Sequence, residues 1–337
     1  MEIKILNEDL YEDYENFLLS DPRSLFYHSI KYKNFLEDLL GCESRYLLAY
    51  ENNKIIAALP LMIKDGPLGK VINSLPYYGS NGGIIGDSHN KDAISLFKND
   101  LSLMEYASLT MVSSPTEDSI SELFSTFTDQ RISQITPLDP DSDDYDQYIF
   151  SVIESSTRRN IRKAQNLNIK VSIQNEKALP LLEQVHNENM LSIGGKAKSP
   201  DFFSKIRHHF EPMRDYKVYV AESEGISIAG LLLFFYNKTV EYFTPVIQQE
   251  HREKQALGLL VFEAMKDSMA KGYNAWNWGG TWLTQTGVYQ FKKKWGAIEK
   301  SYHYATIIKN SNILSVDQKI LMKAYDGFYI YNFSKIK

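Results

Sequence analysis

The sequence is almost free of cysteine, and its single thiol, Cys42, excludes an intrachain disulfide. Nothing in the cysteine usage therefore indicates an oxidising compartment. Cys42 has no histidine near it in the sequence, so we interpret it as a buried small residue rather than a nucleophile. Metal-ligand spacings of His, Cys and Asp are also missing, and the adjacent His208 and His209 would diverge on a helix. We expect no metal.

Long hydrophobic runs are missing as well. The longest, residues 228–236, is well short of the ~18 apolar residues that a membrane helix needs, and by its length it predicts a buried strand. The first ten residues carry Glu2, Lys4, Glu8 and Asp9 where a signal peptide would have an apolar core. We therefore expect a cytoplasmic protein without a membrane span.

A strong excess of charge of one sign is the third absence. The net charge is −5, so electrostatic binding of nucleic acid by the whole surface is not indicated, and we expect no DNA partner. A local basic patch remains compatible with this charge. The chain is long enough for two domains at 337 residues. Its hydrophobic content of 43% is sufficient to form a hydrophobic core in each. We assign most of its Tyr and Phe residues to that core.

Two segments repeat one pattern of alternating apolar residues. Residues 45–63 predict two strands joined by a turn at residues 51–54, and residues 216–235 predict the same arrangement with a turn at residues 222–225. Laid side by side without gaps, Ala49 aligns with Ala221 and Ala57 with Ala229. This favours an internal duplication over chance alternation. We predict an α/β (α+β) fold of two similar lobes, each with a mixed, mainly antiparallel sheet flanked by helices.

An acidic, proline-bearing stretch at residues 138–146 is the best candidate for a lobe boundary. We place the first lobe at residues 1–150 and the second at 151–310. Residues 311–337 would form a C-terminal helix and tail.

The second lobe contains a strand that leads through a polar turn into a helix starting near Ala256. The N–H groups at the start of a helix can hold a phosphate or a developing oxyanion. Gln255 and Gly258 lie at this point, although an ordinary strand-to-helix loop explains them equally well.

A sharper cluster follows at residues 277–297. The strand containing Asn277 ends in Gly279 and Gly280, which allow a ligand or another backbone to approach closely. Lysines 292–294 then stand between Phe291 and Trp295. Because both aromatic residues must pack, at least one lysine should point into the adjacent groove, where it could hold a phosphate or stabilise an oxyanion. Each charge could instead lie on a solvated face.

Three motifs, in order, carry a resemblance to a known family. The run Tyr289-Gln290-Phe291-Lys292-Lys293-Lys294-Trp295-Gly296-Ala297 resembles the closing signature of the Fem family, the peptidoglycan bridge-forming aminoacyl-transferases, and of their shorter acetyltransferase relatives. Residues 158–164 resemble the basic helix that opens the second lobe in that family, and residues 75–83 its first-lobe glycine-rich loop.

The resemblance implies two tandem acetyltransferase-like (GNAT) lobes that transfer an acyl group to an amine. It implies no permanently bound cofactor, with acyl-CoA or aminoacyl-tRNA as co-substrate and a small-molecule or nucleotide- or lipid-linked acceptor. The chain departs from the family in lacking a long charged helical pair and in having Asn277 where relatives often have an acidic residue. Our leading hypothesis is an N-acyltransferase acting on a cell-envelope precursor or amino sugar. A tRNA-dependent aminoacyl ligase and a non-catalytic glycan- or nucleotide-binding protein are the alternatives.

The candidate residues divide by role. Lys292, Lys293 and Lys294 would stabilise the oxyanion or a phosphate, and Glu241 or Tyr289 would relay the amine proton, with His186 a weaker base. The acceptor would contact Tyr77, Tyr78, Asn81, Gly82, Arg158, Arg159, Arg162, Asn277, Gly279 and Gly280, and the donor Gln255 and Gly258.

Overall fold

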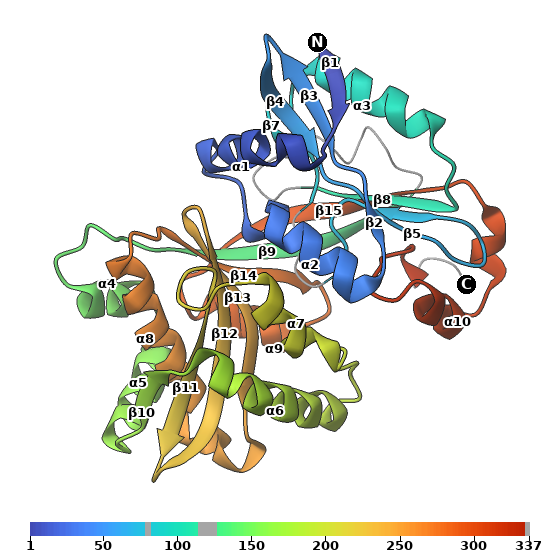
Figure 1. Cartoon of the computed structure of the whole chain (residues 1–337). Helices are drawn as coiled ribbons and strands as arrows, with labels where there is room; N and C mark the ends of the chain where they lie inside the picture. The colour runs from blue at the N-terminus through green and yellow to red at the C-terminus, as the bar shows by residue number, and fades with distance from the viewer. Residues whose placement is uncertain (78–81, 114–126, 334–337) are drawn as a thin grey trace. The chain divides into compact units, whose positions relative to one another are not determined.

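The chain forms two compact units, as the computed structural model in Figure 1 shows for residues 1–77, 82–113 and 127–333. The first unit contains Met1–Ser133 and Lys300–Lys337, and the second contains Gln134–Glu299. These limits differ from the predicted boundaries at residues 150 and 310. Strand β9 (Phe127–Pro137) runs from one unit into the other, and the acidic stretch after it contributes Leu138 to the core of the second unit.

The first unit has short strands with helices packed against them. Its strands pair in the orders β1-β3-β4-β7 and β15-β8-β6-β5-β2, with β6 and β8 parallel. The elements are β1 (Glu2–Ile5), α1 (Tyr11–Ser20), α2 (Ile30–Leu40), β2 (Glu43–Ser44), β3 (Leu47–Glu51), β4 (Lys54–Leu59), β5 (Met62–Lys64), β6 (Val71–Asn73), β7 (Ile85–Gly86), α3 (Lys91–Leu103), β8 (Ser108–Val112), β15 (Ile298–Ile308) and α10 (Gln318–Ala324).

The core of this unit lies under α3. Ala93, Phe97 and Leu101 recur every four residues, so they form one buried stripe that packs against apolar residues of β3 and β4 such as Leu47 and Leu59. The helix begins at a capping side chain, because the Asn90 Oδ1 accepts a hydrogen bond from the Ala93 backbone N–H.

The C-terminal segment belongs to the first unit rather than forming a separate tail. Leu321, Tyr325 and Ile330 are buried in a cluster with Val71 and Ala107. The Tyr325 hydroxyl donates to the Gly69 carbonyl oxygen at 2.9 Å. The cluster ties this segment to β6 and to the residues just before β8.

The two predicted hairpins have the same structure, one in each unit. Ala49 pairs with Ala57 across β3 and β4, and Ala221 pairs with Ala229 across β11 (Tyr216–Ser223) and β12 (Ile226–Tyr236). The register shifts at the next residue in both hairpins. Both turns have two residues at positive φ, which matches the right-handed twist of paired strands.

The second unit is an antiparallel sheet extended by one parallel strand. Its strand order is β10-β11-β12-β13-β14, in which β13 and β14 are parallel. Its other elements are α4 (Tyr145–Val152), α5 (Ser155–Asn166), β10 (Lys170–Ile173), α6 (Leu179–Ser192), α7 (Asp201–His209), β13 (Thr239–Ile247), α8 (Ala256–Ala270), β14 (Ala275–Trp282) and α9 (Thr286–Lys293).

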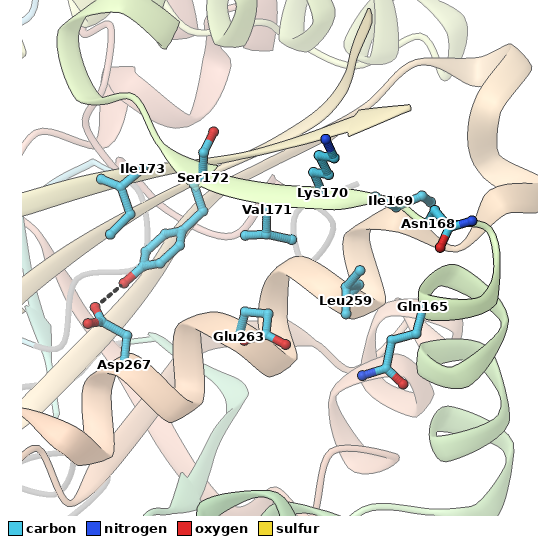
Figure 2. Close-up of a pocket in the computed structure, with 11 residues that line it drawn as sticks. Gln165, Asn168, Ile169, Lys170, Val171, Ser172, Ile173, Leu259, Glu263 and Asp267 are labelled. Atoms are coloured by element: carbon cyan, nitrogen blue, oxygen red, sulfur yellow. Dashed lines mark hydrogen bonds between the residues drawn. The ribbon is translucent and has the colours of Figure 1, made fainter. Parts of the chain in front are cut away.

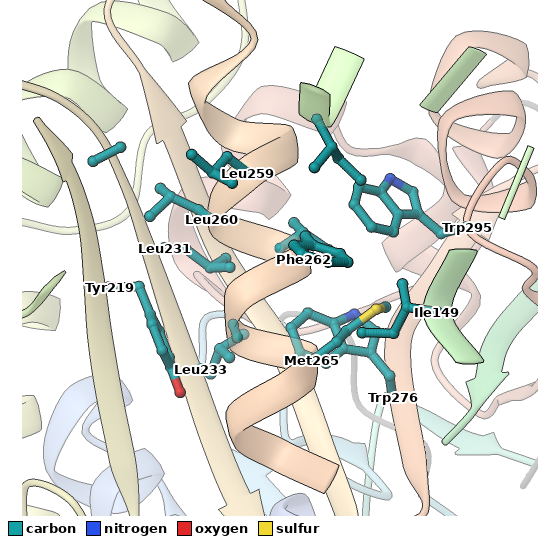
Figure 3. Close-up of a cluster of buried hydrophobic side chains, with 14 of the residues drawn as sticks. Ile149, Tyr219, Leu231, Leu233, Leu259, Leu260, Phe262, Met265, Trp276 and Trp295 are labelled. Atoms are coloured by element: carbon teal, nitrogen blue, oxygen red, sulfur yellow. The ribbon is translucent and has the colours of Figure 1, made fainter. Parts of the chain in front are cut away.

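The two faces of this sheet differ. Leu259, Phe262 and Met265 of α8 pack on residues of one face, among them Leu231 and Trp276 (Figure 3). Helix α5 packs against α8, whereas α6 packs against β12 and β13 and α7 against α6. Because successive side chains of a strand alternate, the neighbours of those core residues point away from α8.

Candidate active site

Lys292, on α9, points its side chain inward to the end of β14, and the sequence predicted that at least one lysine of the run would point inward. Its side chain is buried, and its Nζ donates to the Thr281 Oγ1 at 2.8 Å and to the Gly279 and Gly280 carbonyl oxygens at 3.3 Å each. Burial lowers the pKa of Lys292 to about 8. The group therefore changes charge close to neutral pH, where a small change in its surroundings decides whether it is an ammonium.

A buried amide fixes this arrangement. The Gln134 Oε1 accepts from the Thr281 hydroxyl at 3.1 Å, and the Gln134 Nε2 donates to the Tyr289 carbonyl oxygen at 3.1 Å. Gln134 thus links β14 to α9 and holds the hydroxyl that contacts Lys292. Neither Gln134 nor Thr281 was predicted as a site residue, because nothing in the sequence brings β9 next to β14.

Glu241 and Asn277 lie side by side on the sheet face that points away from α8. They are register partners across β13 and β14, and both are buried. The Asn277 Oδ1 accepts from the Gly279 backbone N–H at 2.9 Å, and Gly279 has φ +71°. Pairing of the two strands ends at Glu241 and Asn277, although both strands continue. Asn277, Gly279, Gly280 and Lys292 are thus linked by hydrogen bonds along β14, and Glu241 lies beside Asn277 on the neighbouring strand.

A second buried lysine, which the sequence did not reveal, lies on the α6 side of the sheet. The Lys198 Nζ is 5.4 Å from the Phe202 ring centroid and 5.5 Å from that of Phe243, and burial lowers the pKa of Lys198 to about 8. Its backbone N–H donates to the His186 Nε2 at 3.2 Å. Burial, assisted by the Lys198 charge, lowers the pKa of His186 to about 4, so His186 is a neutral acceptor here.

The remaining residues of the lysine run lie elsewhere. Lys293 and Lys294 are exposed. The Tyr289 hydroxyl donates to the Glu299 carboxylate, and this bond raises the pKa of Tyr289. The structure brings none of these three side chains into the group around Lys292.

The predicted arginines lie on α5, whose buried residues Ile161 and Ala164 pack with α8 in the core. The Arg158 Nη1 donates to the Phe150 carbonyl oxygen at 2.5 Å. Arg159 and Arg162 are exposed and line a hollow of about 590 Å³. They lie on the α8 side of the sheet, so they do not join Glu241 and Asn277.

The start of α8 has the predicted strand-to-helix geometry. Gln255 adopts the left-handed conformation at φ +59°, and no side chain caps the first turn of the helix. An added methyl group at Gly258 would find no atom within 4 Å, so the space beside that turn is open. The Gly258 and Leu259 backbone N–H groups donate to the Gln255 carbonyl oxygen, so this turn offers a phosphate the positive end of the helix dipole beside open space.

The first-unit candidates form a separate group. Tyr77 has φ +78° and its backbone N–H donates to the Gly327 carbonyl oxygen at 3.0 Å. Gly82 is buried, and a Cβ there would lie 2.0 Å from the Ser74 carbonyl oxygen. Tyr78 and Asn81 lie outside the described residues.

A larger pocket, of about 660 Å³, opens between β10 and α8 (Figure 2). Asp267 on its wall accepts hydrogen bonds from the Tyr219 hydroxyl at 2.6 Å and from the Lys217 Nζ. The pocket contains none of the predicted site residues. Within the described ranges, no group of His, Cys, Asp and Glu could hold a metal ion. In the same part of the chain, no helix combines the length and hydrophobicity needed to cross a membrane.

Comparisons with known proteins identify the fold. Residues 154–293 match the family model of the acetyltransferase (GNAT) domain. The structure is similar to that of FemX, with a TM-score of 0.72 at 14% identity over 94% of this chain and 99% of FemX. It is similar to the C-terminal domain of a putative lysylphosphatidylglycerol synthetase from Agrobacterium fabrum, with a TM-score of 0.54 at 11% identity over 97% and 100%.

A tandem GNAT protein from the clavulanic acid biosynthesis pathway is also similar, with a TM-score of 0.52 at 11% identity over 91% of this chain and 98% of that one. A search of curated proteins gave no match. The second unit is therefore a GNAT domain, and the chain has the tandem-lobe GNAT fold. The fold is similar to those of FemX and of a tandem GNAT protein, as the sequence resemblance predicted, and the GNAT domain supports an acyl- or aminoacyl-transferase.

Proposed function

We propose that this chain transfers an acyl group from acyl-CoA or a similar activated donor to an amine of a cell-envelope precursor or amino sugar. The observation that carries this proposal is the buried Lys292 Nζ, held at the end of β14 beside the point where β13 and β14 cease to pair. A cation fixed in a desolvated site stabilises the oxyanion of acyl transfer far better than one in water.

The proposed donor site is the start of α8. GNAT domains use acyl-CoA as co-substrate. The uncapped first turn and the open space at Gly258 would take its phosphates, and the nearby Arg252 and Lys254 add positive charge at the same end.

The proposed chemistry needs no residue beyond the group described. The acceptor amine attacks the donor carbonyl carbon, so that a C–N bond forms while the C–S bond of the thioester breaks. Lys292 stabilises the oxyanion, which is a stronger acceptor than the two carbonyl groups 3.3 Å from its Nζ. Glu241 takes the amine proton, directly or through water, and that proton then passes to the departing thiolate.

The test is thiol release from acetyl-CoA in the presence of amino sugars and nucleotide-linked envelope precursors. We expect turnover with one acceptor class, and a lower kcat for Lys292→Met with unchanged melting temperature. Lys271→Met, which removes an exposed lysine of the same unit, is the control. Absence of both thiol release and stabilisation by acyl-CoA would contradict the donor assignment. Product formation from charged tRNA would then identify the aminoacyl-ligase alternative.

A further inference from the structure

An exposed apolar patch surrounds the turn between β14 and α9. Trp282 is 49% exposed, Leu283 55%, Val288 45% and Phe291 36%. Four large apolar side chains thus face solvent within ten residues of one segment. Scattered single residues of this kind are ordinary, but a cluster on one segment is typical of a surface that binds something apolar.

The turn that presents this patch is ordered. The Gln285 backbone N–H donates to the Trp282 carbonyl oxygen at 2.9 Å, and the Trp282 backbone N–H donates to the Gln285 Oε1 at 3.4 Å. These bonds close residues 282–285 into a turn with Trp282 and Leu283 on it. The backbone that carries the two exposed side chains is therefore fixed by two hydrogen bonds.

The helix that follows continues the patch. Val288, Phe291 and Trp295 are spaced by three and four residues, so they share one face of α9 and its last turn. Trp295 is buried in the core, and Phe291 packs edge-on against Trp278 with ring centroids 5.8 Å apart. The apolar stripe is thus buried at its C-terminal end, at Trp295, and exposed to solvent at Val288, beside the turn.

The charged side chains next to the patch are two lysines and Glu299, whose carboxylate accepts from the Tyr289 hydroxyl. Lys293 and Lys294 are exposed, and among the described residues neither forms an ion pair. Trp and Leu at a turn combined with neighbouring lysines suit the boundary between the headgroups and the hydrocarbon of an anionic membrane. A lysine close to such a surface adds electrostatic attraction that a neutral membrane lacks.

We infer that the patch of Trp282, Leu283, Val288 and Phe291 docks the protein reversibly on an anionic lipid surface. The indole of Trp282 and the side chain of Leu283 enter the interface while Lys293 and Lys294 stay at headgroup level. Such docking would bring the adjacent site at Lys292 to lipid-linked acceptors.

Trp282 reports the contact directly, because it is the exposed member of the four tryptophans. The other three, Trp276, Trp278 and Trp295, are at most 2% exposed. Vesicles of phosphatidylcholine with phosphatidylglycerol should shift the tryptophan emission to shorter wavelength, and brominated phosphatidylcholine in them should quench it. Vesicles of phosphatidylcholine alone should give a much weaker response.

Substitutions distinguish vesicle binding by the patch from nonspecific hydrophobic adsorption of the protein. Leu283→Ser should weaken partitioning onto the anionic vesicles about tenfold. Lys294→Gln should weaken it about fivefold, and on anionic vesicles alone. Leu191→Ser is the matched control, because Leu191 is 77% exposed and belongs to α6, outside the patch. Each variant is compared with the wild type by melting temperature.

The proposal is overturned if the wild type binds neither kind of vesicle. It is also overturned if Leu191→Ser weakens vesicle binding as much as Leu283→Ser does. Self-association that Leu283→Ser abolishes, without vesicle binding, would also overturn it and make the patch a contact between copies. Because the measurement uses neither donor nor acceptor, its outcome is independent of the proposed acyl transfer.

Discussion

Two opposing effects act on the proton of Lys292. Burial disfavours the ammonium and lowers its pKa to about 8, while Thr281 and two carbonyl oxygens offer it hydrogen bonds. If the ammonium stabilises the oxyanion, kcat/KM falls as pH rises through about 8, because the charge is lost there. A pH–rate profile checks this. Lys292→Met should lower kcat by ~100-fold or more and remove the decline. Activity that instead rises through this pH would assign Lys292 to a basic role.

His186 makes stability depend on pH. Its pKa in the folded state, about 4, lies below the ordinary 6.5, so on acidification the unfolded chain binds the proton first. The stabilisation is complete above pH 6.5 and is lost as pH falls from 6.5 towards 4. It amounts to ~3 kcal/mol. Urea unfolding at about pH 7 and about pH 4.5 measures the loss. His186→Gln should reduce this dependence, whereas substitution of the exposed His208 should leave it intact.

Single residues differ in how far the sequence predicts them. The placement of Lys292 could be anticipated, because Phe291 and Trp295 had to pack and so turned one lysine of the run inward. Lys198 could not, since it stands in a polar loop and is buried by Phe202 and Phe243, residues that tertiary structure brings to it. Gln134 is similar: its amide joins β14 and α9, a contact that no local pattern encodes.

At the scale of elements, the two hairpins were predictable but their strand limits were not. Alternation of apolar side chains and the turn residues indicated paired strands, which the structure shows with Ala49 opposite Ala57 and Ala221 opposite Ala229, but the predicted strand ending at residue 63 divides into β4 and β5. The parallel pairing of β13 with β14 was not predictable in this way. It depends on α8 crossing between them, and therefore on packing that follows from the whole sheet.

Two glycines in different elements should respond oppositely to alanine. Gly258 lies in the first turn of α8 with open space around it, so Gly258→Ala should stabilise the protein by up to ~1 kcal/mol. If the turn holds the donor phosphates, the same methyl group should weaken acyl-CoA binding. Gly82→Ala places a Cβ 2.0 Å from the Ser74 carbonyl oxygen and should destabilise by ~3 kcal/mol or prevent folding. Melting temperatures and acyl-CoA titrations check both, and a stabilised Gly258→Ala variant with unchanged acyl-CoA affinity would place the donor elsewhere.

At the scale of the whole molecule, two lobes were predictable but their limits were not. Internal repetition indicates the number of lobes, whereas the limits depend on which core each segment joins. Ile149 and Leu138 join the core around α8, so the acidic stretch belongs to the second unit instead of separating it from the first. The last residues join a cluster with Val71 and Ala107, contacts of more than 200 residues in sequence separation that no local signal predicts.

Removing the C-terminal segment should therefore destabilise the first unit and spare the second. Truncation after Asn310 deletes Ile313, Leu321 and Tyr325 and uncovers Val71 and Ala107. Each buried side chain contributes about 1.5–3 kcal/mol, so the combined loss approaches the total stability of a domain. Hydrogen exchange should show lost protection in β6 and β8 but retained protection in β11 and β12. Tyr325→Phe, which removes the bonds to Leu68 and Gly69, should give a weaker change of ~1–2 kcal/mol in the same strands. Equal loss in both units would mean that they unfold together.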